Sequence, residues 1–173
     1  MLILVSGGSA SGKSKFAEDL AVQGPEAKIY LATMKIWDGE SVERVERHRA
    51  MRKGKGFDTL ERSELLAGAD VPEGSAVLLE DLSNLCANEW FGALGPEKAF
   101  ERIMDGLAAL SRKAARLVVV TNELFSDGVA YDKETADYLA CLAKLNRAIA
   151  AKADAVWEVV CGIPICHKGG EIR

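Results

Sequence analysis

Residues 1–20 read MLILVSGGSASGKSKFAEDL, an apolar run followed by a glycine-rich turn and a segment with helical spacing. Residues 7–14 match GxxxxGK[ST], a pattern that indicates a phosphate-binding loop when a strand precedes it and a helix follows it. Both neighbours are predicted here, because residues 2–5 are apolar and residues 13–20 have helical spacing. A strand, a loop and a helix in this order predict an α/β domain.

Further apolar runs extend this unit into a parallel sheet. Predicted strands cover residues 2–6, 28–33, 76–80, 117–121 and 155–161. Their apolar residues are continuous rather than alternating, which suits strands that are buried on both faces. Predicted helices cover residues 13–22, 39–52, 82–93, 97–114 and 133–152, and residues 52–57 and 125–131 are predicted to be loops. We expect one domain over residues 1–173, with a mostly parallel sheet and helices on both faces.

The composition is typical of a globular protein and argues against some partners. Hydrophobic residues make up 49% of the chain and charged residues 28%, with a net charge of −4. A mildly acidic protein is a poor candidate for nonspecific binding to nucleic acid or a membrane surface. No secretory signal and no apolar run of ~20 residues is present, so we expect no membrane span and a cytoplasmic location.

The loop at residues 7–14 predicts a nucleotide site of the P-loop NTPase kind. Its glycines allow backbone angles that side chains would forbid, so that successive N–H groups can turn toward an anion. Lys13 can reach the outer phosphates, and the Ser14 hydroxyl can bind Mg²⁺. The alternative is a glycine-rich turn that binds nothing. The predicted nucleotide-binding residues here are Gly7, Gly8, Ser9, Ala10, Ser11, Gly12, Lys13 and Ser14.

A carboxylate partner for Mg²⁺ is expected at the end of another buried strand, where Glu80 and Asp81 stand. Aspartate is a favoured N-cap residue, so we assign Asp81 to capping the next helix and Glu80 to metal binding and catalysis. Residues 121–123 (TNE) follow the next strand along the chain. Because ligands dock at the carboxyl ends of strands in open α/β sheets, these polar groups are expected at the same cleft.

The predicted helix at residues 39–52 places Arg44, His48 and Arg52 on one face, each four residues from the next. An imidazole between two guanidinium groups is expected to have a lowered pKa, and a neutral imidazole can attack phosphorus. The arginines could then hold the phosphates of the molecule under attack. Taken alone, however, the segment is better explained as a charged, solvated helix face, because alternating charges mark an exposed helix surface.

Six stretches together carry a resemblance over nearly the whole chain: residues 7–14 (GGSASGKS), 30–33 (YLAT), 45–52 (VERHRAMR), 78–81 (LLED), 120–123 (VTNE) and 153–164 (ADAVWEVVCGIP). In this order they resemble the bifunctional adenosylcobinamide kinase / adenosylcobinamide-phosphate guanylyltransferase family of cobalamin biosynthesis. The HRxxR segment is the most specific of them.

The resemblance implies two reactions on one chain. The phosphate loop would transfer a phosphoryl group from ATP or GTP to adenosylcobinamide, with Lys13 and Glu80 as catalytic residues. His48 would take GMP from GTP and pass it to adenosylcobinamide phosphate, with Arg49 and Arg52 among the nucleotide-binding residues. The resemblance also implies a homotrimer. Two rival functions remain open, a single-function P-loop kinase for another small alcohol and a nucleotide-hydrolysing regulatory or assembly factor.

Overall fold

One seven-stranded sheet organises the computed structural model, which describes residues 1–35, 46, 50, 52–125 and 128–169. Its strand order is β3-β2-β4-β5-β1-β6-β7. All neighbouring strands pair in parallel except β6 and β7, which are antiparallel. The predicted mostly parallel sheet is therefore confirmed. The strands are β1 (Leu2–Ser6), β2 (Lys28–Ala32), β3 (Phe57–Glu61), β4 (Ala76–Glu80), β5 (Arg116–Val120), β6 (Ala155–Val160) and β7 (Ile163–Lys168).

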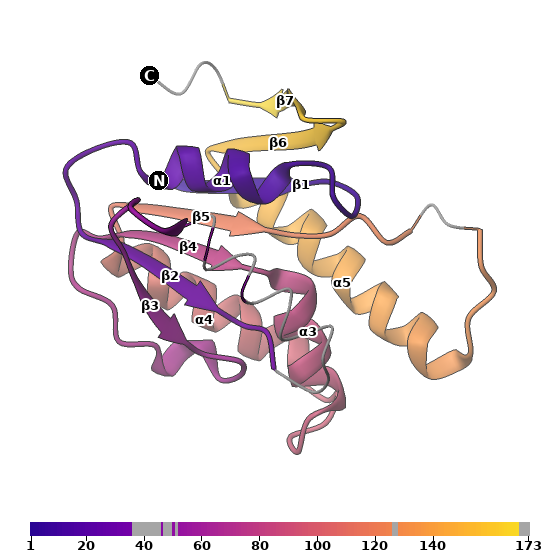
Figure 1. Cartoon of the computed structure of the whole chain (residues 1–173). Coiled ribbons are helices and arrows are strands. Elements are labelled where there is room, and N and C mark those ends of the chain that lie inside the picture. The colour runs from indigo at the N-terminus through magenta and orange to yellow at the C-terminus, as the bar shows by residue number, and fades with distance from the viewer. Residues whose placement is uncertain (36–45, 47–49, 51, 126–127, 170–173) are drawn as a thin grey trace.

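Helices cover both faces of the sheet, as predicted (Figure 1). Helix α1 (Lys13–Ala21) packs on one face, where Ala17 and Leu20 join a core with Ile3 and Val5 of β1. The opposite face carries the larger core, which is covered by α3 (Leu82–Phe91), α4 (Ala99–Lys113), α5 (Lys133–Lys152) and the short 3-10 helix η1 (Leu66–Gly68). No helix within the described residues is long and apolar enough to cross a membrane.

Two strands, β3 and β7, are absent from the sequence-based prediction, and both lie at the edges of the sheet. Strand β3 (FDTLE) mixes apolar and polar residues because none of its residues is fully buried. Strand β7 (IPICHK) contains Pro164 and is exposed along its whole length. The prediction of a loop at residues 52–57 is wrong at its end, since Phe57 already begins β3.

Helix ends also differ from the prediction by a few residues. Pro96 suggests a helix start at residue 97, but α4 begins at Ala99, whose backbone N–H donates a hydrogen bond to the Pro96 carbonyl. Within the predicted helix at 39–52, the structure describes only residues 46, 50 and 52, and these three are helical.

The parallel register gathers the polar strand ends at one edge. Ala32 lies opposite Glu80, and Val5 lies opposite Val120. The phosphate loop, Glu80 and the segment after β5 therefore meet at the carboxyl edge of the sheet, where open α/β sheets bind ligands.

Candidate functional site

The glycines of the phosphate loop serve two different purposes. Gly12, just before α1, has φ +92°, a left-handed angle that favours glycine. Gly7 has no such angle, but a Cβ there would lie 2.6 Å from the Val159 carbonyl oxygen, so the position requires the small residue for space. Gly8 meets neither condition, and Ala10 adopts φ 55° without being a glycine. The prediction of unusual backbone angles thus holds at Gly12 and is wrong at Gly7 and Gly8.

The hairpin between β6 and β7 contacts the phosphate loop, although the two segments lie near opposite ends of the described chain. The Gly162 N–H donates a hydrogen bond of 2.8 Å to the Ser11 carbonyl. The Cα atom of Gly162 lies only 3.3 Å from the place that a Cβ on Gly12 would occupy. The loop is therefore held in shape before any ligand binds.

Lys13 and Ser14 begin α1 with their side chains turned to the loop and to β4. Lys13 is buried, and its Nζ donates a hydrogen bond of 3.0 Å to the Gly8 carbonyl. The Ser14 hydroxyl donates a hydrogen bond of 2.6 Å to Oε1 of Glu80. The phosphate loop and the acidic end of β4 thus form one site.

Glu80 is buried, and this environment controls its protonation. Burial and the nearby Asp81 carboxylate raise its pKa from the ordinary value of 4.5 to about 8. The hydrogen bond from Ser14 and the charge of Lys13 oppose this rise. At neutral pH in the ligand-free protein, Glu80 therefore carries a proton, and an added cation would favour its release.

Asp81 caps helix α3, as the capping preference predicts. Its carboxylate accepts hydrogen bonds from the Asn84 N–H at 2.7 Å and from the Ser83 hydroxyl at 2.6 Å. Asn122, from the segment after β5, donates to the same carboxylate at 3.2 Å. Thr121 is fully buried and instead donates to Asn146 of α5. Of the two side chains, only Asn122 reaches the end of β4.

A second buried carboxylate, Glu18, lies one helical turn beyond Ser14 on α1. Its side chain is 1% exposed and pairs with Lys55, with 2.5 Å between Oε2 and Nζ. Its other oxygen, Oε1, is buried and has no hydrogen-bond partner within the described part of the chain. This ion pair joins α1, the helix after the phosphate loop, to the segment that leads into β3.

Replacing Lys55 by alanine is expected to lower the free energy of unfolding by about 1–3 kcal/mol, because Glu18 would remain as a buried, unpaired carboxylate. Urea unfolding measures the loss. Lys15→Ala is the matched control, since it removes an exposed pair with Asp19 on the same helix and should leave the stability almost unchanged. Equal losses in the two variants would contradict a structural role for the buried pair.

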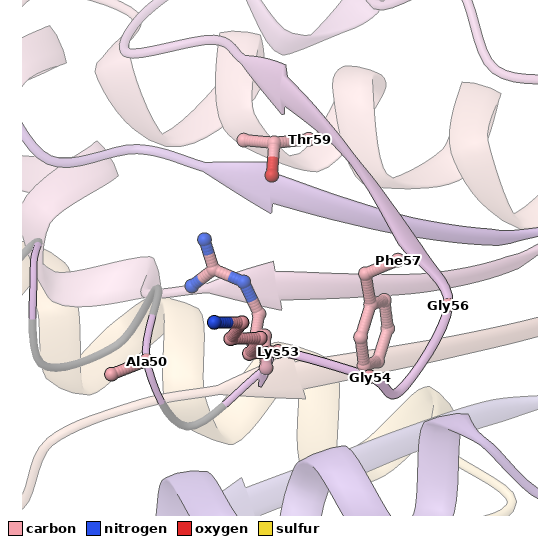
Figure 2. A pocket seen from close by; sticks show the side chains of 7 residues that line it. Ala50, Lys53, Gly54, Gly56, Phe57 and Thr59 are labelled. Atoms are coloured by element: carbon pink, nitrogen blue, oxygen red, sulfur yellow. The ribbon is translucent and has the colours of Figure 1, made fainter.

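A pocket with a volume of about 720 Å³ opens beside β3, and we call it the edge pocket. Figure 2 shows Lys53 between Ala50 and the ring of Phe57 in this pocket. Arg52 also lines it, and its guanidinium carbon lies 3.3 Å from the centre of the Tyr30 ring. The lining residues are Ala50, Arg52, Lys53, Gly54, Gly56, Phe57 and Thr59.

The predicted site residues thus fall into two groups. The structure brings Lys13, Ser14 and Glu80 together. Arg52 lines the edge pocket and lies over Tyr30, and Arg44, His48 and Arg49 lie outside the described residues. The other histidine, His167, is on exposed β7, where its Nε2 lies 2.9 Å from a Glu158 carboxylate oxygen.

Sequence reasoning missed Glu18, Tyr30 and Lys55. The signal for Glu18 was its spacing, since it stands four residues after Ser14 on the same helix face. No comparable signal exists for Lys55, because its contact with Glu18 depends on how the chain returns to the sheet edge at β3.

Comparison with known proteins shows that the chain belongs to a family. The family model "Cobinamide kinase / cobinamide phosphate guanyltransferase" matches residues 3–166. The bifunctional adenosylcobalamin biosynthesis protein CobU of Salmonella typhimurium is 34% identical over 95% of this chain and 98% of its own length. The corresponding protein of Pseudomonas aeruginosa, CobP, is 32% identical over 96% of each chain.

Solved structures agree with the fold at much lower identity. An ATPase of a bacterial type III secretion system superposes with a TM-score of 0.53 and 13% identity, covering 91% of this chain and 50% of that one. A KaiC-like protein of Pyrococcus horikoshii gives a TM-score of 0.51 and 12% identity, covering 99% of this chain and 81% of that one. These likenesses show a P-loop ATPase type of fold.

Proposed function

Because the chain belongs to the cobinamide kinase / cobinamide phosphate guanyltransferase family, we propose that it catalyses both reactions with two separate sets of residues. Lys13, Ser14 and Glu80 carry the kinase reaction, and His48 carries guanylyl transfer. The observation that supports the kinase assignment is the hydrogen bond between Ser14 and Glu80 beside the buried Lys13. The family match also spans the segment that contains His48.

In the kinase step, the hydroxyl oxygen of cobinamide attacks the γ-phosphorus of ATP or GTP, and the nucleoside diphosphate leaves. Lys13 would bind the outer phosphates, because its ammonium group has three N–H donors and the hydrogen bond to the Gly8 carbonyl uses one of them. The hydroxyl proton needs an acceptor. Glu80 can take it once the positive charge of the bound site has lowered its pKa from about 8.

Mg²⁺ fits the donor set at this site, because hard cations prefer oxygen ligands. The Ser14 hydroxyl and the Glu80 carboxylate are already 2.6 Å apart and would hold the ion together with nucleotide phosphates. When bound, Mg²⁺ neutralises charge on the phosphates.

In the transferase step, a neutral His48 nitrogen attacks the α-phosphorus of GTP, and the bond to the β-phosphate oxygen breaks to release pyrophosphate. A phosphate oxygen of cobinamide phosphate then attacks the same phosphorus. The bond to the imidazole breaks, and the product carries GMP on its phosphate. Dividing the displacement in this way replaces one difficult step by two easier ones.

Incubation with labelled GTP tests this proposal. Denatured protein should retain label from the α-phosphate and none from the γ-phosphate, and acid but not base should remove it. Cobinamide phosphate added before denaturation should take up the label. Retention of γ-label, or of no label at all, would favour a single-function kinase or a hydrolysing switch. The homotrimer and the cytoplasmic location stay predictions.

A further inference from the structure

Two buried cysteines, Cys86 and Cys141, meet where α3 packs on α5. Cys86 is fully buried and Cys141 is 8% exposed, and both belong to the core on the sheet face opposite α1 (Figure 1). Neither is in a disulfide, and their thiols are hydrogen-bonded to each other. The proposed reactions use neither thiol. Two sulfur atoms in hydrogen-bond contact are close to the separation from which a disulfide bond of about 2 Å can form.

The packing of α3 on α5 holds the two thiols together. The Tyr138 hydroxyl donates a hydrogen bond of 3.2 Å to the Ser83 carbonyl. The Tyr138 ring also packs against Phe91, with 5.6 Å between the ring centres. Each of the two hydrogen-bonded residues stands three residues before the cysteine of its own helix, and residues at this spacing share a helix face. The contact between the thiols is therefore part of one continuous helix interface.

The two thiols differ in reactivity because their surroundings differ. The hydrogen bond to Cys141, together with burial, raises the pKa of the Cys86 thiol, so Cys86 keeps its proton. The hydrogen bond from Cys86 and the charge of Lys144 lower the pKa of the Cys141 thiol, although burial opposes them. Cys141 is also the more exposed of the two. Cys141 is therefore the better nucleophile, and Cys86 is placed to react after it.

We propose that Cys86 and Cys141 form a site of reversible oxidation, at which hydrogen peroxide converts the two thiols into a disulfide that links α3 to α5. The Cys141 thiolate attacks one peroxide oxygen, the O–O bond breaks, and hydroxide leaves and takes up the proton that Cys141 released. The Cys86 sulfur then attacks the sulfur of the resulting sulfenic acid, and the hydroxyl leaves as water with the Cys86 proton. Two thiols are oxidised, and one peroxide is reduced to two water molecules. This inference does not rest on the proposed function.

The disulfide would join two helices that both contact the carboxyl edge of the sheet. Helix α3 begins after its cap Asp81 at the end of β4, and Asn146 of α5 accepts a hydrogen bond from Thr121 after β5. The bond closes the chain between residues 86 and 141, which restricts the unfolded chain and so stabilises the fold. Its formation also consumes the sulfenic acid before further, irreversible oxidation. Exposure to peroxide is therefore expected to make the protein more resistant to unfolding.

Treatment of the folded, full-length protein with hydrogen peroxide tests the proposal. After alkylation and trypsin digestion, mass spectrometry should find peptides 63–98 and 134–144 joined, and dithiothreitol should separate them. Cys161 and Cys166 are the matched control, because both are exposed but are separated by the hairpin turn and about 10 Å of extended β7. They should stay unlinked within one chain. Absence of the joined peptides, or their formation only in urea, would overturn the proposal.

Urea unfolding with and without dithiothreitol measures the consequence for stability. The midpoint of the oxidised wild type should lie about 1 M or more above that of the reduced protein. Cys141→Ala should lose this rise, whereas Cys166→Ala, which removes an exposed thiol, should retain it. A rise that persists in Cys141→Ala, or a linked wild type without a rise, would contradict the stabilising role. If Cys141→Ala fails to fold, the joined peptides of the wild type still decide whether the disulfide forms.

Discussion

Replacing His48 by alanine is expected to abolish the α-phosphate label that the denatured protein retains from GTP. The imidazole supplies the nitrogen that takes the GMP group, so its removal eliminates the covalent step instead of slowing it. Loss of a nucleophile costs at least about 10³-fold in known cases, which for this assay means label at background. Scintillation counting of acid-sensitive, base-stable label on denatured protein measures the effect.

His167→Ala is the control, because His167 is the only other histidine in the chain. It lies on the exposed strand β7 beside Glu158, and its loss should leave the label intact. A label that survives His48→Ala and disappears with His167→Ala would reverse the assignment. A label that survives both changes would identify another nucleophile, such as a lysine.

Replacing Glu80 by glutamine is expected to lower the kinase rate and to raise stability at alkaline pH. The amide cannot accept the hydroxyl proton, and loss of a general base slows a reaction by about 10²- to 10⁴-fold. Glutamine also lowers the number of carboxylates that could hold Mg²⁺ beside Ser14. Initial rates of phosphoryl transfer to cobinamide measure the first effect.

The effect on stability follows from the direction of the pKa change. The pKa of Glu80 is raised by folding from 4.5 to about 8, so its contribution to stability is complete below pH 4.5 and is lost as the pH rises to about 8. Glutamine does not ionise. The difference in unfolding free energy between the variant and the wild type should therefore grow over this interval, by about 2–5 kcal/mol.

Urea unfolding of the ligand-free proteins at pH 5, 7 and 9 measures this difference. Glu97→Gln, which changes an exposed carboxylate before α4, should show no such trend and normal kinase activity. A Glu80→Gln protein with wild-type kinase activity would remove Glu80 from catalysis. A constant stability difference across the three pH values would show that Glu80 is ionised in the free protein.

Much of this architecture could be predicted because the buried strands read as continuous apolar runs. A second local signal, the N-cap preference of aspartate, distinguished the capping role of Asp81 from the proposed catalytic role of Glu80. Tertiary contacts seldom change such a capping preference. The prediction failed for β3 and β7, whose exposed positions give them no apolar signature. Edge strands are specified mainly by the strand beside them, which a single sequence does not reveal.

In the candidate site, too, some residues could be predicted from local sequence and others could not. Lys13 and Ser14 follow from a local motif, and their contact with Glu80 follows from the rule that parallel strands end at a common edge. The contact of Glu18 with Lys55 and that of Arg52 with Tyr30 join segments that are distant in sequence. Neither contact could be derived before the path of the chain into β3 was known.

The brace between Gly162 and Ser11 has a consequence for synthesis on the ribosome. The phosphate loop emerges early, but the hairpin that supports it emerges after almost all of the described chain, and β1 must wait for both of its neighbours, β5 and β6. Such long-range pairing makes folding slow. A nascent chain that stalls before β6 therefore displays the nucleotide motif without the hydrogen bond that supports the loop from Gly162.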